Sequence, residues 1–133
     1  MRATGDNAIG SLSGGQRQAL TLLMATWRRP QILLLDEHTA ALDPKSADQV
    51  IRLTQEVVQS ARLTVLMVTH SMQQATSLGD RIIMLNKGLV AHDFAGTEKS
   101  RLRSEDLVDR FEEIRRRELL DESAARLLKE HYL

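Results

Sequence analysis

Two segments of this chain place acidic and imidazole side chains where they could act on a phosphorylated ligand. Asp36 and Glu37 follow the aliphatic run Ile32-Leu33-Leu34-Leu35, and His70 follows a second run of that kind. Adjacent carboxylates can divide the work, because Asp36 can face a Mg²⁺ ion while Glu37 polarises an attacking water as a general base. If both runs are parallel strands, their carboxyl ends share one edge of a sheet, and His70 joins the carboxylates there.

A third segment, Ser13-Gly14-Gly15, could hold an anion. Ser13 can cap a helix that runs to about Trp27, so the two glycines fall at a helix N-terminus. The unpaired backbone N–H groups and the helix dipole attract negative charge there, and the missing side chains let a phosphate come close. The segment is therefore suited to a terminal phosphate.

Each of these segments also has a plain structural interpretation. The Ser-Gly-Gly tripeptide could be a flexible linker, the Asp36-Glu37 pair a helix cap, and His70 a structural histidine. The expected meeting of three such segments at one edge favours the functional interpretation.

The pattern of the elements predicts an α/β fold, a mostly parallel sheet flanked by helices and finished by an antiparallel hairpin. The strand Gln31–Asp36 is apolar in its middle and is expected to be buried on both faces. The remaining expected elements are a helix from about Lys45 to Ser60, a strand Thr64–Thr69, a helix Met72–Leu78, a strand Arg81–Leu85, a turn Asn86-Lys87-Gly88 and a strand Leu89–His92.

From Glu98 onward the chain is densely and almost evenly charged, which is typical of solvated helices. Ser104 predicts the start of one helix and Asp121 the start of another, and both carry apolar stripes that should dock on something. Arg115-Arg116-Arg117 could be a basic contact patch, but the glutamates beside it favour a solvated face.

Composition sets limits on the class of protein. A chain of 133 residues that is 42% hydrophobic can build one ordinary domain. With 18 basic and 18 acidic residues, bulk charge draws it neither to nucleic acid nor to an anionic membrane. It contains no cysteine, and its longest apolar runs of four residues predict no membrane insertion and no signal peptide.

Five motifs in order between about Ile9 and Asp93 resemble ATP-binding-cassette (ABC) nucleotide-binding domains. They are the signature motif Leu12–Gln16, the Walker B strand Ile32–Asp36, the catalytic glutamate Glu37, the D-loop Ala41-Leu42-Asp43 and the switch histidine in Thr69-His70. The resemblance implies a partial P-loop NTPase-like fold. It makes residues 1–97 the C-terminal part of an ABC ATPase domain and residues 98–133 a charged helical extension.

The resemblance also implies ATP and Mg²⁺ as cofactors and a role for each site residue. Two such domains close head to tail around two ATP molecules, so a second nucleotide-binding domain is an expected partner. Ser13, Gly14, Gly15 and Gln16 would contact the γ-phosphate bound to that partner, and Asp43 would lie at the dimer seam. Within the same subunit, Asp36 would hold Mg²⁺, Glu37 would orient water and His70 would contact the γ-phosphate.

Two features depart from the family pattern. His38 stands where most relatives have proline, and the stretch Asp-Glu-His-Thr-Ala-Ala-Leu-Asp-Pro looks like a bacterial importer subgroup; we interpret His38 as a marker of that subgroup and not as catalytic. The sequence also contains no Gly-x-x-x-x-Gly-Lys-Ser/Thr phosphate loop. We therefore expect a truncated domain that is inactive alone, with exposed apolar edges and a tendency to self-associate.

The expected function is that of the ATP-binding subunit of an ABC transporter, coupling ATP hydrolysis to transport, with import of a small solute favoured. Such a subunit would lie on the cytoplasmic, inner face of the cell membrane, bound to transmembrane permease subunits. Two alternatives remain open: a non-transport ABC ATPase, and a noncatalytic fragment that docks on an intact cassette domain.

Overall fold

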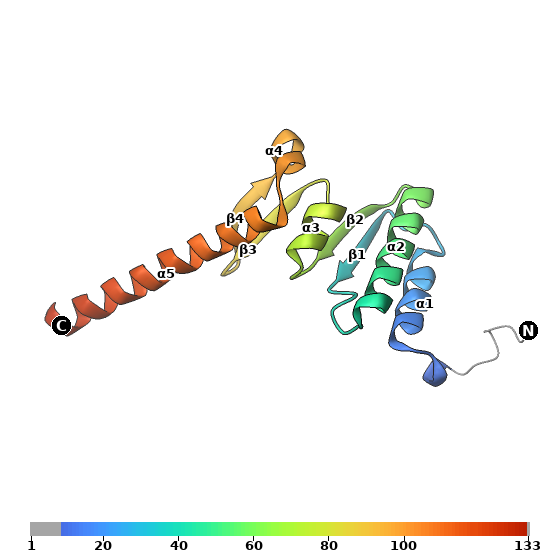
Figure 1. Cartoon of the computed structure of the whole chain (residues 1–133), viewed down its shortest axis with the longest axis horizontal. Coiled ribbons are helices and arrows are strands. Elements are labelled where there is room, and N and C mark those ends of the chain that lie inside the picture. Colours follow the sequence, from blue (N-terminus) through green and yellow to red (C-terminus); the bar gives the residue numbers. More distant parts are fainter. Residues whose placement is uncertain (1–8, 133) are drawn as a thin grey trace, which may run out of the picture. The chain divides into compact units, whose positions relative to one another are not determined.

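The computed structural model describes residues 9–132, which fall into two compact units divided between His70 and Ser71 (Figure 1). The first unit holds a 3₁₀ turn η2 (Ile9–Ser11), α1 (Gly14–Thr26), β1 (Ile32–Asp36), α2 (Pro44–Ala61) and β2 (Thr64–Val68). The second holds α3 (Met72–Leu78), β3 (Ile82–Asn86), β4 (Leu89–Phe94), α4 (Gly96–Arg101) and α5 (Ser104–Tyr132). The expected helices and strands up to Phe94 are all found, with ends that differ by two residues or fewer.

In the first unit, β1 and β2 pair in parallel, with Ile32 opposite Thr64 and Asp36 opposite Val68. Because side chains alternate along a strand, every second residue of β1 points toward the helices. Leu33 and Leu35 are buried there together with Leu22 of α1. Apolar side chains of α2 and β2 pack against this core: Leu53, Val58, Val65 and Met67.

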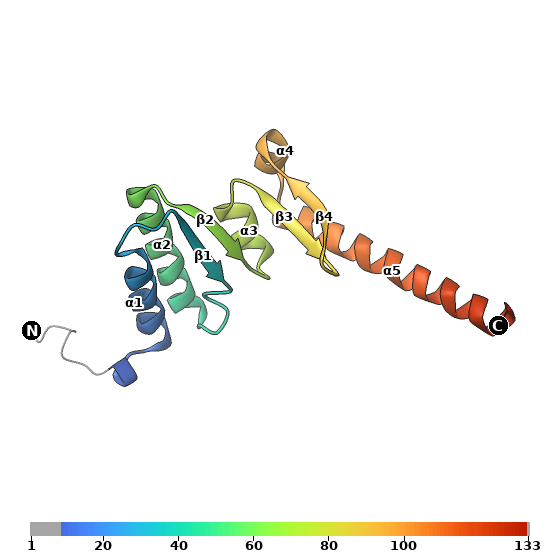
Figure 2. The same ribbon diagram turned by 180° about the vertical axis from the view of Figure 1, so that it is seen from behind.

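The opposite face of this sheet is open. Leu34 is 66% exposed and Leu66 is 56% exposed, and their neighbours Ile32 and Val68 are more than half exposed. In both views α1 and α2 lie on the same side of the two strands (Figures 1 and 2). The expectation that β1 is buried on both faces is therefore wrong for this unit, since a single layer of helices covers a single face. The exposed apolar surface that the sequence predicts is confirmed.

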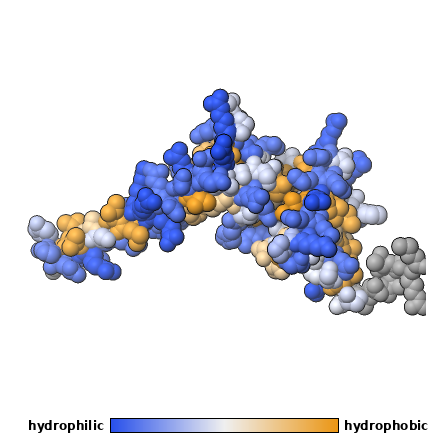
Figure 3. Space-filling model, viewed as in Figure 1, coloured by the Kyte–Doolittle hydropathy of each residue, from blue (hydrophilic) through white to orange (hydrophobic). Residues whose placement is uncertain are grey.

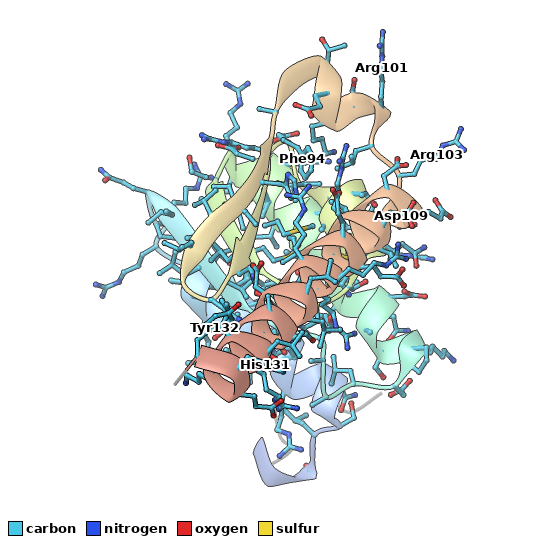
Figure 4. The ribbon with its side chains drawn as sticks, turned by 90° about the vertical axis from the view of Figure 1, so that its left-hand side faces the viewer. Phe94, Arg101, Arg103, Asp109, His131 and Tyr132 are labelled. Atoms are coloured by element: carbon cyan, nitrogen blue, oxygen red, sulfur yellow. The ribbon has the colours of Figure 1, made fainter. Side chains whose placement is uncertain are left out.

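In the second unit, β3 and β4 form an antiparallel hairpin through Lys87 and Gly88, which both have positive φ. Positive φ at both turn residues suits the twist of a two-residue hairpin. The hairpin packs Ile82, Met84 and Phe94 against Leu107 of α5, and Met72 and Ala75 of α3 border this core. Figure 4 shows Phe94 on β4 beside the start of α5. Within the described residues the two strand pairs form separate two-stranded sheets, not one sheet with an antiparallel edge.

The charged tail differs from its prediction. Residues Ser104–Tyr132 form one continuous helix of 29 residues, so the expectation of a second helix starting at Asp121 is wrong. No glycine or proline interrupts this stretch. Pairs spaced at i,i+4, Glu112 with Arg116 and Glu113 with Arg117, also support a single helix. The division into residues 1–97 and 98–133 stays a prediction.

No helix within residues 9–132 has both the length and the apolar character that crossing a bilayer requires.

Leu107 anchors α5 to the hairpin, because its side chain is 1% exposed. We expect Leu107→Ala to lower the free energy of unfolding by about 2–5 kcal/mol through lost burial and a residual cavity. The neighbouring change Val108→Ala, at a side chain that is 42% exposed, is the control and should cost much less. Urea denaturation followed by circular dichroism measures both, and equal effects would contradict this packing.

Candidate functional site

Glu37 and His70 meet where β1 and β2 end side by side. The backbone N–H of Glu37 donates to the carbonyl oxygen of Val68 at 2.8 Å, which extends the parallel ladder by one residue. Beyond it, Glu37 Oε1 lies 2.6 Å from Nε2 of His70. The glutamate side chain is 34% exposed and the histidine 87%, so the pair is open to solvent. The expected meeting of these two residues at the carboxyl edge of the parallel strands is confirmed.

The backbone of Glu37 is unusual, because its φ of +45° lies in the left-handed region. A residue with a Cβ occupies this region at a cost of order 1–3 kcal/mol, and such residues gather at functional sites. The turn that follows is closed by the N–H of Ala40, which donates to the carbonyl oxygen of Glu37 at 3.0 Å. The chain therefore bends away from the sheet directly after the carboxylate.

Asp36 lies on the open face of the sheet. Alternation along β1 puts it on the same side as the exposed Ile32 and Leu34, opposite the buried Leu33 and Leu35. Within residues 9–132 no three His, Asp or Glu side chains gather into a metal-binding cluster. A single carboxylate suits Mg²⁺ that takes its other ligands from phosphates and water.

Ser13 and Gln16 hold the start of α1 by capping each other. The N–H of Gln16 donates to Ser13 Oγ at 3.1 Å, and the N–H of Ser13 donates to Gln16 Oε1 at 2.9 Å. This capping box satisfies two backbone donors that a bare helix end leaves unpaired. Both polar side chains of the predicted phosphate-contacting segment therefore also have a structural function.

The glycines at this helix end allow α1 to approach α2. A Cβ built on Gly15 would lie 3.0 Å from Cβ of Ser46, and one built on Gly14 would lie 3.2 Å from a methyl group of Leu42. From the sequence, we explained the two glycines by the close approach of a phosphate. The structure adds a second reason, close helix packing, which the sequence analysis missed.

Asp43 caps α2 next to these glycines. Its carboxylate accepts a hydrogen bond from the N–H of Ser46 at 3.1 Å, and hydrogen bonding to Ser46 lowers the pKa of the Asp43 carboxyl. A groove of about 280 Å³ runs between the two helices. It is lined by Ser13, Gly15, Gln16, Ala19, Ser46, Gln49, Val50 and Leu53. The predicted site residues thus form two groups, one at the strand ends and one at the starts of α1 and α2.

His38 connects the loop after Glu37 to α2. Its Nε2 lies 3.2 Å from Oγ1 of Thr54, whose hydroxyl donates to the carbonyl oxygen of Val50 at 2.7 Å. Since that hydroxyl already donates, the imidazole N–H donates to Thr54. Burial lowers the pKa of His38, so the ring is held neutral. One signal for this contact is visible in the sequence, the threonine Thr54 within the apolar stripe of α2, but nothing in the sequence identifies His38 as its partner.

Comparison with known proteins finds relatives whose descriptions agree with one another. Residues 1–40 match the family model described as ABC transporter. The tyrosine transport ATP-binding protein of Clostridioides difficile (strain R20291) is 50% identical over 107 residues, which are 80% of this chain and 43% of that protein. An aliphatic sulfonates import ATP-binding protein of Burkholderia cenocepacia (strain HI2424) is 46% identical over 63% of this chain and 26% of its own length.

A solved structure of an ABC transporter also matches this chain. A protein described as a metal-chelate type ABC transporter, in an inward-facing conformation, superposes with a TM-score of 0.64 at 34% identity. The match covers 80% of this chain and 41% of that chain. This chain therefore spans less than half the length of the relatives it matches.

The lowered pKa of the partly buried His38 predicts a pH dependence of stability. Because its pKa is lower in the folded than in the unfolded state, the unfolded state binds more protons as pH falls below the ordinary value of 6.5. The free energy of unfolding should therefore fall between about pH 7 and pH 5, and His38→Gln should reduce that slope. Urea denaturation across this range measures it, with His131→Gln at an exposed side chain as the control. A slope unchanged in His38→Gln would contradict the prediction.

Proposed function

Because this chain belongs to the ABC transporter ATP-binding proteins, we propose that a full-length protein carrying it is the ATPase subunit of an importer for a small solute. Its relatives are named for transport or import of tyrosine, aliphatic sulfonates, methionine and phosphonates. These solutes are the ones named for the relatives, and the proposal assigns no particular solute to this protein. The observation that carries the proposal is the 2.6 Å contact between Glu37 and His70 at the end of two paired parallel strands.

In the proposed chemistry, Glu37 is the general base. Its carboxylate would accept the proton of a water that attacks the terminal phosphorus, while the bond from that phosphorus to the bridging oxygen breaks and ADP leaves. The positive φ of Glu37 sets the direction in which its side chain leaves the backbone. Nε2 of His70, which holds the carboxylate in place, also contacts an oxygen of the terminal phosphate. Bound MgATP supplies the phosphoryl group and the charge of the ion.

Asp36 would hold the magnesium ion through its water shell. Its position on the open face of β1 supports this role, because a ligand can reach the carboxylate there without displacing the buried leucines. The apolar residues beside it mark where a further layer of a complete domain would pack. A phosphate loop would have to come from that further part, since these 133 residues contain none.

The second group of residues would serve a partner's nucleotide. Ser13, Gly14, Gly15 and Gln16 contact the terminal phosphate bound to a second nucleotide-binding domain, and Asp43 lies at the seam between the two. The helix start supports this role through its dipole and its small residues. The complete subunit would bind transmembrane permease subunits at the cytoplasmic face of the membrane.

Removing the carboxylate of Glu37 separates catalysis from binding. In a full-length protein, Glu37→Gln should lower ATP turnover by about a hundredfold or more, because a general base contributes on the order of 10²–10⁴. ATP affinity should stay within a few fold. Phosphate release and calorimetric titration measure the two quantities, with Glu56→Gln on the exposed side of α2 as the control. Unchanged turnover would remove Glu37 from this role.

The 133-residue chain alone should bind MgATP with micromolar or weaker affinity and should not hydrolyse it. The reason is that neither the backbone cradle nor the lysine of a phosphate loop is present in its sequence. Isothermal titration calorimetry and a phosphate-release assay test this. Nanomolar binding, or turnover that Glu37→Gln abolishes, would show that these residues suffice.

A further inference from the structure

Helix α5 carries two apolar stripes on different sides. The first contains Leu107 and Ile114, which pack on the hairpin core of the second unit. The second contains Leu120, Ala124 and Leu127, with Leu128 beside them. At about 100° per residue, the second stripe is turned by about 120° around the helix axis from the first. A partner that packs on one face of the helix therefore cannot bury both stripes.

Among the described residues of its own unit, 71–132, nothing buries the second stripe. Leu120 is 70% exposed, Leu127 58% and Leu128 60%, and all residues from 119 to 132 are exposed. The contacts of α5 with the hairpin turn reach as far as Glu118, which accepts a hydrogen bond from Asn86 at 2.6 Å and lies 3.3 Å from Nζ of Lys87. Figure 3 shows apolar side chains over the C-terminal part of the helix, and Figure 4 shows His131 and Tyr132 at its last turn.

The second stripe is arranged to fit a copy of itself in the opposite direction. If two such helices cross with Ala124 on the two-fold axis, Leu120 of each copy lies opposite Leu128 of the other. The small side chain at the centre lets the helix axes come within about 9 Å, inside the usual packing range of about 8–10 Å. The leucines on either side can then interdigitate.

Charges along the edge of the stripe favour the antiparallel direction. Around the same axis, Arg116 of each copy falls beside Glu130 of the other, which gives two opposite-charge pairs. A parallel pairing would instead place Arg117, which lies about 20° around the helix from Ala124, against its own copy, and like charges would repel. In the single chain Arg116 and Arg117 pair with Glu112 and Glu113 on the exposed surface, where such pairs are weak and can be shared.

We propose that residues 116–132 of α5 form an antiparallel pair with the same segment of a second copy of this chain. Fewer than five helical turns give a small interface, below the roughly 1,200 Å² of stable complexes, so the pair is weak and concentration-dependent. This contact involves none of the residues assigned to ATP hydrolysis and does not depend on that function.

Cysteine cross-linking of the full chain tests the geometry, because the protein has no cysteine of its own. Under mild oxidation Ala124→Cys should give a disulfide-linked dimer, since the crossing brings the two Cα atoms within the 4.4–6.8 Å or so of a disulfide. Glu122→Cys, on the other side of the helix, is the matched control and should stay monomeric.

The direction of pairing is tested by two further variants. In the antiparallel pair the two copies of residue 120 lie about 12 Å apart along the axis, so Leu120→Cys alone should not cross-link. A mixture of Leu120→Cys and Leu128→Cys should give the mixed dimer. Cross-linking of Leu120→Cys with itself would overturn the antiparallel arrangement.

Sedimentation velocity over a concentration series tests the association itself. The double variant Leu120→Glu/Leu127→Glu should lower the dimer fraction severalfold while circular dichroism shows the helix intact. Leu34→Glu, on the open face of β1, is the comparison and should leave the Ala124→Cys cross-link unchanged. A monomer at all concentrations, or association that only Leu34→Glu removes, would overturn the proposal.

Discussion

The rest of the first unit depends on the parallel pairing of β1 with β2. This pairing directs Leu33 and Leu35 into the core with α1 and α2, and alternation then puts Asp36 on the opposite, open face. The ladder continues one residue further through the N–H of Glu37, which brings its carboxylate to His70. A slip by one residue would exchange Leu33 and Leu35 in the core for Ile32 and Leu34 and would also bury the Asp36 carboxylate, so the cost of burying that charge favours the observed register.

The second constraint is the close contact between the starts of α1 and α2. Gly15 lies against Ser46, while Ser13 and Asp43 each cap the helix that follows them. The small residues thus serve the packing of these helices as well as any approach of phosphate. Substitutions here change the fold and the ligand site together, so loss of activity at a signature glycine does not by itself identify a phosphate contact.

Both units leave apolar surface open, but the two surfaces differ. The open face of β1 and β2 continues to the carboxylate Asp36, in a chain that spans less than half the length of its relatives. The second stripe of α5 lies away from the hairpin core, and no described residue of its own unit buries it. Its leucines surround a central alanine, and charges of opposite sign lie near its two ends, a pattern that suits a copy of itself.

The sequence by itself determined the local structure and was enough to propose the site residues. The elements up to Phe94 and the shared edge of Glu37 and His70 could be predicted, because their signals lie within contiguous stretches of sequence. These signals are the capping residues, Pro30 and Pro44, and apolar residues that recur with a period of 2 or 3.6. Tertiary structure decided the rest: the single covered face of the sheet, the approach of Gly15 to Ser46, the bond of His38 to Thr54 and the continuous helix α5. The first three features depend on which distant surfaces pack together. Helix α5 continues through Asp121 for a local reason, because a capping residue can start a helix but does not interrupt one. Periodicity shows that a face is apolar, but only packing shows what, if anything, covers it.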